Sequence, residues 1–287
     1  MAKRKYFNGI HYDVDILNKR IILKEPLLKD LQSDNQFLKY KKIGGSTIPD
    51  ILLSNQPFKS EFAAFCHIAR LKLPILQPKY VNAGTILEPK IFDFLREKAL
   101  EVAKAQQTKP LIIENFVAKD YGFDYFKGKI PYESIGGVPD GLLPEKDCIL
   151  EVKTAGEKKR EKWDKEGVDP AYLKQAQLYA YLNGNKYFNI VALFLQDNDY
   201  LHPELVDIRQ RNFKIYPFKV NTIEVVDDIA MVEEWYKKYT STNISPCFDN
   251  SKDADQIAYL MCKSYDEWEK LLDEWKRTGK AVADIEA

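Results

Sequence analysis

The residues best suited to chemistry in this chain are two carboxylates and a lysine near its middle. Asp140 ends the segment Gly-Val-Pro-Asp, and Glu151 opens the segment Glu-Val-Lys that ends at Lys153. A turn between two apolar stretches separates the two motifs, so a β-hairpin would bring Asp140 and Glu151 side by side. Because side chains alternate along a strand, Glu151 and Lys153 share one face and Val152 points away from it.

Such a cluster suits the hydrolysis of a phosphodiester bond with the help of a divalent cation. The carboxylates of Asp140 and Glu151, together with the backbone carbonyl of Val152, could hold a hard ion such as Mg²⁺ or Mn²⁺. Lys153 could then orient or help to deprotonate the attacking water. The competing interpretation is a surface hairpin with ordinary cross-strand charge pairs, because Glu-x-Lys is common by chance.

Three neighbouring segments favour the chemical interpretation. The segment Gly84-Thr-Ile-Leu-Glu88 begins a predicted helix, where the glutamate either caps the helix end or faces a metal. In a second predicted helix Gln175 and Tyr179 share a face, as do Gln177 and Tyr181, unless these polar residues simply face solvent. A basic run also follows Lys153, either as a solvated loop or beside a phosphate-cleaving site: Lys158, Lys159, Arg160, Lys162 and Lys165.

The other metal-binding and catalytic residue types are scattered. Four cysteines at 66, 148, 247 and 262 form no Cys-x-x-Cys pair, and the three histidines are isolated. This pattern argues against a zinc ribbon, a disulfide scaffold and a histidine-rich metal centre. No Gly-x-Gly-x-x-Gly, phosphate-loop or Gly-x-Ser-x-Gly motif supports a small-molecule enzyme. A catalytic ion would therefore be held mainly by carboxylates.

Charge is balanced over the 287 residues but unevenly distributed. Residues 1–83 carry 14 Lys and Arg against 7 Asp and Glu, whereas residues 196–287 carry 12 against 19. The basic region favours a polyanionic partner, although a chance fluctuation of surface charge would look the same. No apolar run approaches the roughly 18–20 residues of a membrane span, and no apolar signal core follows the first residues. We expect a soluble, cytoplasmic protein that does not bind membranes.

The order of elements predicts an α/β fold with a central mixed β-sheet flanked by helices, followed by a helical C-terminal tail. One domain is expected over 1–240, with a basic region at 1–83 and a catalytic core at 84–195, and an acidic tail over 241–287. Expected strands lie at 20–24, 111–118, 121–127, 135–143, 148–154, 187–195 and 213–220. Expected helices lie at 61–72, 85–106, 170–183, 222–239, 254–261 and 265–276, with a short helical segment at 49–54.

Taken together, the motifs resemble the PD-(D/E)xK nuclease superfamily and, more narrowly, the phage lambda exonuclease and YqaJ viral recombinase family. Val-Pro-Asp140 with Glu151-Val-Lys153 is similar to the superfamily signature, and Gln175 to Tyr179 is similar to the Gln-x-x-x-Tyr element of its exonuclease branch. Lys42-Ile-Gly-Gly-Ser46 resembles the family's early Gly-Gly-Ser element. These motifs occur in the family's order between about residue 40 and residue 195, over half of the chain.

The resemblance implies a restriction-endonuclease-like core and a specific division of labour. Glu88, Asp140, Glu151 and the Val152 carbonyl would surround one or two Mg²⁺ or Mn²⁺ ions. Lys153 would position the attacking water, and Gln175 would steady Lys153, the water or the scissile phosphate. DNA and phosphate contacts are expected from the following residues: Ser46, Lys42, Lys41, Gln177, Tyr179, Lys158 and Arg160.

The function implied is Mg²⁺-dependent hydrolysis of linear double-stranded DNA, from 5′ to 3′, in phage-type recombination. The expected partners are DNA ends and a single-strand annealing protein, and family members that form ring-shaped trimers suggest a homotrimer. Two alternatives stay open at this point. One is a DNA endonuclease of the same superfamily, and the other is a non-catalytic DNA-binding protein that retains the fold.

Overall fold

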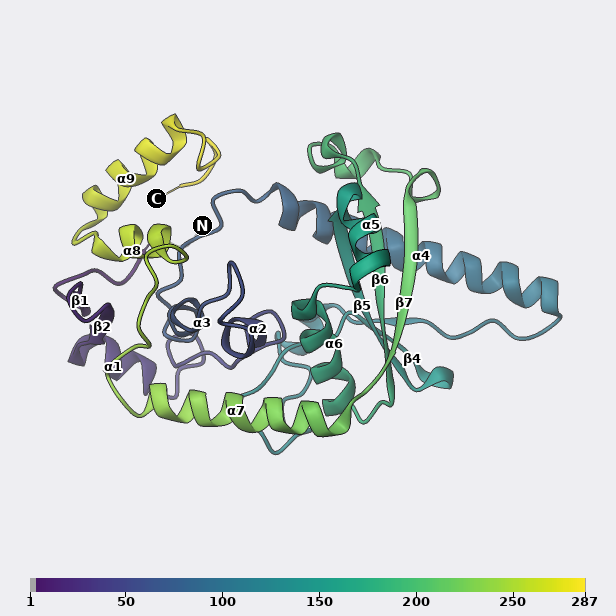
Figure 1. Cartoon of the computed structure of the whole chain (residues 1–287), viewed down its shortest axis with the longest axis horizontal. Coiled ribbons are helices and arrows are strands. Elements are labelled where there is room, and N and C mark those ends of the chain that lie inside the picture. The colour runs from purple at the N-terminus through teal and green to yellow at the C-terminus, as the bar shows by residue number, and fades with distance from the viewer. Residues whose placement is uncertain (1–3, 287) are drawn as a thin grey trace. The chain divides into compact units, whose positions relative to one another are not determined.

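The computed structural model describes residues 4–286, which divide into two compact units (Figure 1). The sheet unit comprises Gly44–Ser46 and Lys79–Ile229. The helical unit comprises, of the described residues, those up to Ile43, Thr47–Pro78 and those from Ala230 onward. The segment 1–240, expected from the sequence as one domain, contributes residues to both units, and described residues of the expected tail, 241–286, belong to the helical unit.

The sheet unit is built on five strands in the order β3-β4-β5-β6-β7. Strands β4 and β5 are antiparallel, β5 and β6 are parallel, and β6 and β7 are antiparallel. The chain therefore has the mixed α/β fold, with a central mixed sheet flanked by helices, that its sequence predicted. The strands are β3 (Glu114–Asn115), β4 (Gly141–Leu143), β5 (Cys148–Gly156), β6 (Tyr187–Leu195) and β7 (Asn212–Lys219).

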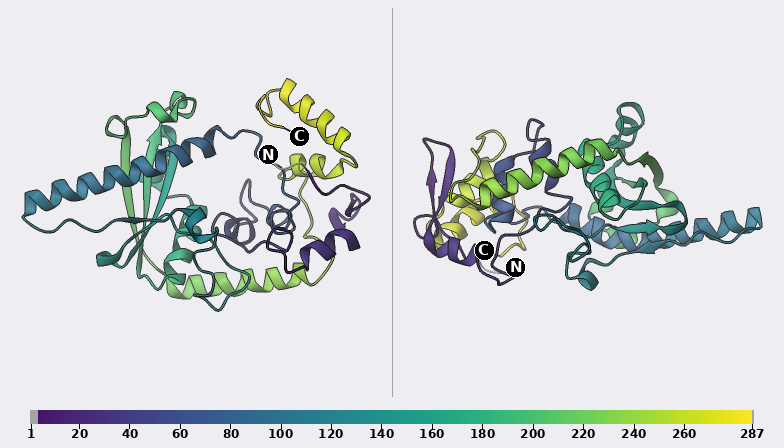
Figure 2. Two further views of the ribbon diagram at one scale, coloured as in Figure 1. Left: turned by 180° about the vertical axis from the view of Figure 1, so that it is seen from behind. Right: turned by 90° about the horizontal axis from the view of Figure 1, so that it is seen from below.

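Helices cover both faces of this sheet. Helix α4 (Lys79–Gln106) crosses one face, as seen from behind in Figure 2, whereas α5 (Glu157–Glu166) and α6 (Pro170–Leu182) lie against the other face in Figure 1. On the α5 side, Trp163 contacts Phe194 edge to face at a centroid distance of 5.6 Å. Helix α7 (Thr222–Thr240) starts in the sheet unit and continues into the helical unit.

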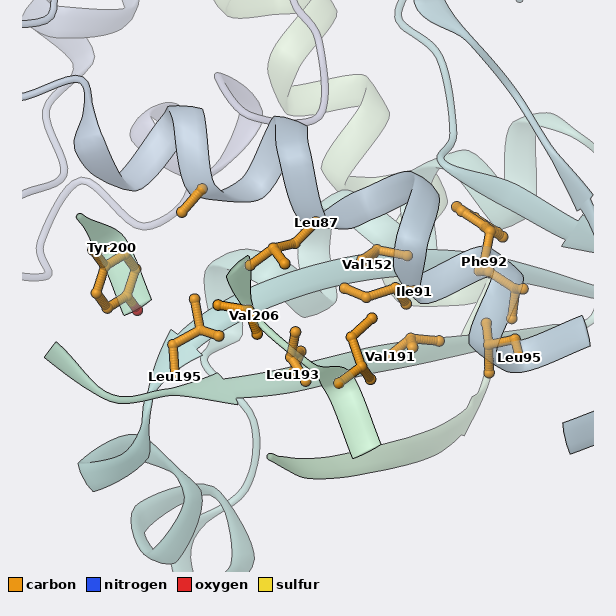
Figure 3. Close-up of a cluster of buried hydrophobic side chains, with 13 residues drawn as sticks. Leu87, Ile91, Phe92, Leu95, Val152, Val191, Leu193, Leu195, Tyr200 and Val206 are labelled. Carbon is orange, nitrogen blue, oxygen red and sulfur yellow. The ribbon is translucent and has the colours of Figure 1, made fainter. Parts of the chain in front are cut away.

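The core of the sheet unit lies between α4 and the sheet (Figure 3). Alternate residues of β5 and β6 point toward α4, and their apolar character is what holds this helix in place. The buried side chains include Leu87, Ile91, Phe92 and Leu95 from α4, Leu150 and Val152 from β5, and Val191, Leu193 and Leu195 from β6. Glu151 and Lys153 alternate with Leu150 and Val152 along β5. They consequently point toward the opposite face, where α6 lies.

The helical unit contains a hairpin of β1 (Tyr12–Asp15) and β2 (Arg20–Leu23) and several helices. Its helices are α1 (Glu25–Leu31), α2 (Ile48–Leu52), α3 (Glu61–Ile68), the later part of α7, α8 (Ala254–Met261) and α9 (Tyr265–Arg277). Ser60 caps α3 by accepting a hydrogen bond from the Ala63 N–H. The expected helices of the C-terminal tail are present, and Trp268, Leu272 and Trp275 form the buried stripe of α9.

Several expected elements are shorter, displaced or absent. The strand expected at 121–127 does not form, because Gly122 and Phe123 have φ of 56° and 65°, which reverses the chain. Of the strand expected at 111–118, only β3 (Glu114–Asn115) forms. Of the strand expected at 135–143, only β4 (Gly141–Leu143) forms. The helix expected at 61–72 ends at Ile68, since Arg70 has φ of 60°.

Helices α4, α5 and α1 and strand β1 also differ from the elements expected from the sequence. Helix α4 begins at Lys79 rather than at Thr85, so Glu88 lies inside the helix instead of in its first turn. The extra turns form because Ala83 is buried in the core and extends the apolar stripe. The basic run after Lys153, for which no helix was expected, lies in helix α5, and Trp163 is its buried residue. Sequence reasoning also missed β1 and α1.

Among residues 4–286 no helix combines the length and the apolar character required to cross a membrane.

Candidate active site

Strands β4 and β5 bring the two predicted carboxylate motifs together. Their antiparallel register pairs Gly141 with Leu150, so Asp140, the residue before β4, follows in line opposite Glu151 and next to Val152. The Asp140 Oδ2 atom accepts a hydrogen bond of 2.7 Å from the Val152 N–H. The hairpin inferred from the sequence therefore exists, and Asp140 takes the place of a strand partner for Val152.

The Val152 carbonyl faces the same edge. Strand β4 pairs with β5 only as far as Leu150, so this side of β5 is open beyond that residue. In a strand the N–H and C=O of one residue point to the same side. The Val152 carbonyl thus shares an edge with the Asp140 carboxylate, as a shared ligand set would require.

Glu151 and Lys153 form an ion pair on the α6 side of β5. Lys153 Nζ lies 2.5 Å from Glu151 Oε1, and the Glu151 side chain is completely buried. Lys153 Nζ also donates to Gln175 Oε1 at 3.4 Å and lies 5.1 Å from the centroid of the Tyr172 ring. Gln175 is thus placed beside the lysine as expected. Tyr172 opens the Tyr-x-x-Gln-x-Gln-x-Tyr pattern of this helix but was given no role from the sequence, although it lies three residues before Gln175 and so shares its helix face.

No donor in the described part of the chain reaches the second carboxylate oxygen of Glu151, and the Glu151 side chain interacts instead with the Asp140 carboxyl group. Glu151 Oε2 is the only carboxylate oxygen among the buried polar atoms that lack a hydrogen bond within residues 4–286. A buried, unpartnered carboxylate oxygen costs free energy unless a cation or a donor reaches it. This atom is therefore the strongest sign that the site is built to receive something.

Burial and mutual repulsion raise the pKa values of the carboxyl groups at the site. Burial raises the pKa of Glu88 to about 7, and the nearby charge of Asp140 adds to the effect. Burial also raises the pKa values of Glu151 and Asp140, and the negative charge of Asp140 raises that of Glu151 further. For Lys153, burial lowers the pKa, but the charges of Glu151 and Asp140 outweigh burial and leave it above its usual value. Carboxylates that repel each other in this way favour a cation between them.

The oxygen atoms available at the site suit a hard divalent ion that takes only some of its ligands from the protein. Within the described residues no three His, Cys, Asp or Glu side chains form a ready-made metal cage. Mg²⁺, however, is usually bound through one or two carboxylates with water and substrate phosphates completing its shell. Asp140, Glu151 and the Val152 carbonyl supply such a partial set, and Glu88 is near enough for its pKa to respond to Asp140 and Lys153.

Tyr179 and two glycine segments enclose this site on the α6 side. Tyr179 is 4% exposed, and its hydroxyl oxygen accepts a 2.9 Å hydrogen bond from the Gly45 N–H. A Cβ at Gly45 would lie 2.5 Å from Gln175 Cγ, and a Cβ at Gly137 would lie 2.3 Å from the Tyr179 hydroxyl. Gly45 and Gly137 are functional candidates that the sequence motifs contained but did not single out. Burial raises the pKa of Tyr179, which keeps its hydroxyl protonated.

The remaining predicted contact residues are more dispersed. Ser46 is exposed and, with Gly44 and Gly45, belongs to the sheet unit, whereas Lys41 and Lys42 belong to the helical unit. Gln177 is buried, and its Oε1 accepts a 3.0 Å hydrogen bond from the Asn221 N–H at the start of α7. On α5, Lys158 is exposed, and Arg160 Nε donates to Glu157 Oε1 at 2.6 Å.

Comparison with known proteins gives relatives whose names state no activity and solved structures of exonucleases. No family model matches the chain. It is 26% identical to the uncharacterized protein MG373 of Mycoplasma genitalium and 23% identical to its homolog in Mycoplasma pneumoniae, with 82% of this chain and 91% of each relative covered.

Among solved structures, LHK-Exo in complex with dAMP gives a TM-score of 0.46 at 14% identity, covering 83% of this chain and 93% of that one. LHK-Exo is an alkaline exonuclease from Laribacter hongkongensis. A phage-related exonuclease from Haemophilus somnus gives a TM-score of 0.45 at 15% identity, covering 71% and 95%. Likeness at this level does not decide what a protein does.

Proposed function

We propose that this chain is a metal-dependent nuclease that hydrolyses phosphodiester bonds of DNA. The observation that carries the proposal is the unpartnered, wholly buried Oε2 of Glu151, next to Asp140 and to a lysine that faces Gln175. A purely structural ion pair would leave neither oxygen of a buried carboxylate without a partner. Asp140 lies where β4 leaves β5 open beyond Leu150, and Glu151 and Lys153 face α6 from the same stretch of β5.

The residues present support hydrolysis in separate ways. Asp140, Glu151 and the Val152 carbonyl would hold the ion, and Glu88 would join them. When bound, Mg²⁺ or Mn²⁺ would neutralise charge on the scissile phosphate. Lys153, kept cationic by its two carboxylate neighbours, would orient the attacking water and stabilise charge that develops on the phosphate. Gln175 would hold the Lys153 ammonium at its place.

We further propose that the enzyme is an exonuclease that degrades linear double-stranded DNA from 5′ to 3′. The basic residues of α5 follow β5 directly, so exposed cations such as Lys158 lie on the chain next to the site and would contact backbone phosphates. Ser46, held in the sheet unit by the Gly45 hydrogen bond to Tyr179, would contact the terminal phosphate.

The test is digestion of a linear 5′-phosphorylated duplex beside a covalently closed plasmid. Each substrate is incubated with Mg²⁺, with EDTA, and with the Glu151→Gln protein, in which the carboxylate is replaced by an amide of the same shape. We expect loss of the linear substrate alone, dependent on both the metal and Glu151. Cleavage of the plasmid would indicate an endonuclease instead. Binding of DNA without cleavage in any arm would contradict the enzymatic proposal and favour a binding protein.

A further inference from the structure

The loop before Gly137 carries an aromatic residue that the catalytic site does not use. Phe123 is 68% exposed and has φ of 65°, in the left-handed region that favours glycine. A bulky side chain in this conformation costs roughly 1–3 kcal/mol, and such strain is concentrated at functional sites. Neither packing nor turn formation accounts for phenylalanine here, because its side chain lies mostly in solvent.

Hydrogen bonds on both sides hold Phe123 in place. Its own N–H donates to the Ala118 carbonyl at 2.8 Å, and the next N–H, of Asp124, donates to the Tyr121 carbonyl at 3.1 Å. The exposed ring is therefore presented by an ordered turn, which would lower the entropic cost of binding a partner.

The same loop is joined to the segment that leads into Asp140. The Tyr125 N–H donates to the Gly137 carbonyl at 2.9 Å, and the Gly137 N–H donates to Asp124 Oδ1 at 3.4 Å. Phe126, the next aromatic residue, packs against Tyr179 with ring centroids 5.6 Å apart. The position of Phe123 is thus coupled to the candidate active site within a single unit of the fold.

The loop that carries Phe123 also contains other aromatic rings and cations. Phe116 stacks on Tyr125 at a centroid distance of 5.0 Å, and Tyr121 meets Tyr125 edge to face at 5.1 Å. Lys129 Nζ lies 3.4 Å from the centroid of the Tyr125 ring, and Lys119 and Lys127 are exposed in the same loop. Exposed aromatic faces beside lysines are the composition that binds single-stranded nucleic acid, in which bases stack and phosphates meet cations.

We infer that Phe123 is a stacking platform for an unpaired nucleobase at the end of the DNA held in the candidate active site. This inference rests on the proposed function and adds a specificity to it, since a frayed or single-stranded end would bind better than a blunt paired end. Lys119 and Lys127 would contact phosphates of the same strand.

The experiment measures binding in EDTA, so that cleavage plays no part. A duplex carries 2-aminopurine as an unpaired terminal base, and its fluorescence is quenched when an aromatic ring stacks on it. Stacking is worth about 1–3 kcal/mol per base, so we expect Phe123→Ala to weaken binding by roughly 5- to 150-fold and to abolish the quenching. Phe123→Trp should retain both affinity and quenching.

Phe58 supplies a matched control. It is also a phenylalanine with a left-handed backbone, with φ of 62° and 94% exposure, but it lies in the helical unit. Phe58→Ala should leave the quenching unchanged. Wild-type quenching and affinity in Phe123→Ala, with cleavage intact, would overturn this inference alone. No binding of DNA by the wild-type protein would overturn the proposed function and this inference with it.

Discussion

At the scale of single residues, the state of Glu151 is what favours the proposed active site over a structural ion pair. Burying a carboxylate is costly unless its charge and both oxygens are compensated. Lys153 compensates the charge and one oxygen, and the other oxygen has no partner among the described residues. The free energy lost there is what a bound cation would recover.

Replacing Lys153 by alanine should abolish cleavage while the protein stays folded. A positioned acid–base or water-orienting group contributes about 10²- to 10⁴-fold, so kcat should fall by at least about 100-fold. The fold should survive because the raised pKa of Glu151 lets it take up a proton when its partner is removed. Single-turnover cleavage and thermal unfolding of the variant measure the two effects.

Lys98→Ala is the control for this variant. Lys98 is exposed on α4, 2.6 Å from Glu101, and its loss should change neither quantity by much. Cleavage near the wild-type rate by Lys153→Ala would remove this lysine from the mechanism.

Gly137 should not tolerate even one added methyl group. Its φ is 132°, and a Cβ would lie 2.3 Å from the Tyr179 hydroxyl. Backbone strain and overpacking together should lower the free energy of unfolding of Gly137→Ala by about 2–5 kcal/mol. Urea denaturation followed by circular dichroism measures the loss.

Gly156→Ala is the matched substitution, since Gly156 has φ of −65° and nothing within 4 Å of an added Cβ. Its stability should stay within about 0.5 kcal/mol of wild type. Equal losses in the two variants would contradict the packing of Tyr179 against Gly137.

At the scale of elements, one face of β5 packs in the core and the other carries the candidate site residues. Leu150 and Val152 anchor α4, and Glu151 and Lys153 face α6, so the alternation of one strand divides core from site. The parallel pairing with β6 runs along all nine residues from Cys148 to Gly156, which holds the site rigidly in register.

Leu193→Ala should destabilise the sheet unit without touching the site directly. Leu193 projects from β6 into the core beneath α4 and is fully buried. Its truncation leaves a cavity that lowers the free energy of unfolding by about 2–5 kcal/mol. The exposed Leu201→Ala variant, at 62% exposure, should change the free energy of unfolding by less than about 0.5 kcal/mol. Denaturation by urea compares the two, and a well-tolerated Leu193→Ala would show that this region is not closely packed.

At the scale of the whole molecule, a bound ion should stabilise the fold. A ligand that binds only the native state at about ten times its Kd adds about 1.4 kcal/mol, or roughly 2–4 °C in Tm. Mn²⁺ should therefore raise the Tm of the wild-type protein, and EDTA should reverse the shift. In Asp140→Asn the shift should be lost, whereas an equal shift in that variant would place the ion elsewhere.

Much of the local structure could be predicted from the sequence because its causes are local. Ser60 caps α3, Asp169 caps α6 by accepting a hydrogen bond from the Ala171 N–H, and Gly184 with φ of 77° follows the end of α6. The apolar runs of β5 and β6 marked buried strands. The segment 111–143 was predicted poorly, because its backbone is set by left-handed residues such as Phe123 that carry no sequence signal for that conformation.

The sequence by itself determined which groups are available and, through the period of a strand, that Glu151 and Lys153 share a face. Only the tertiary structure decided that Gln175 meets Lys153, that Tyr179 is buried against Gly45 rather than exposed to a ligand, and that Gly44–Ser46 belongs to the sheet unit. The physical reason is that alternation and capping act over a few residues. Contacts such as the one from Gly45 to Tyr179 join positions far apart in the chain and depend on how whole elements pack.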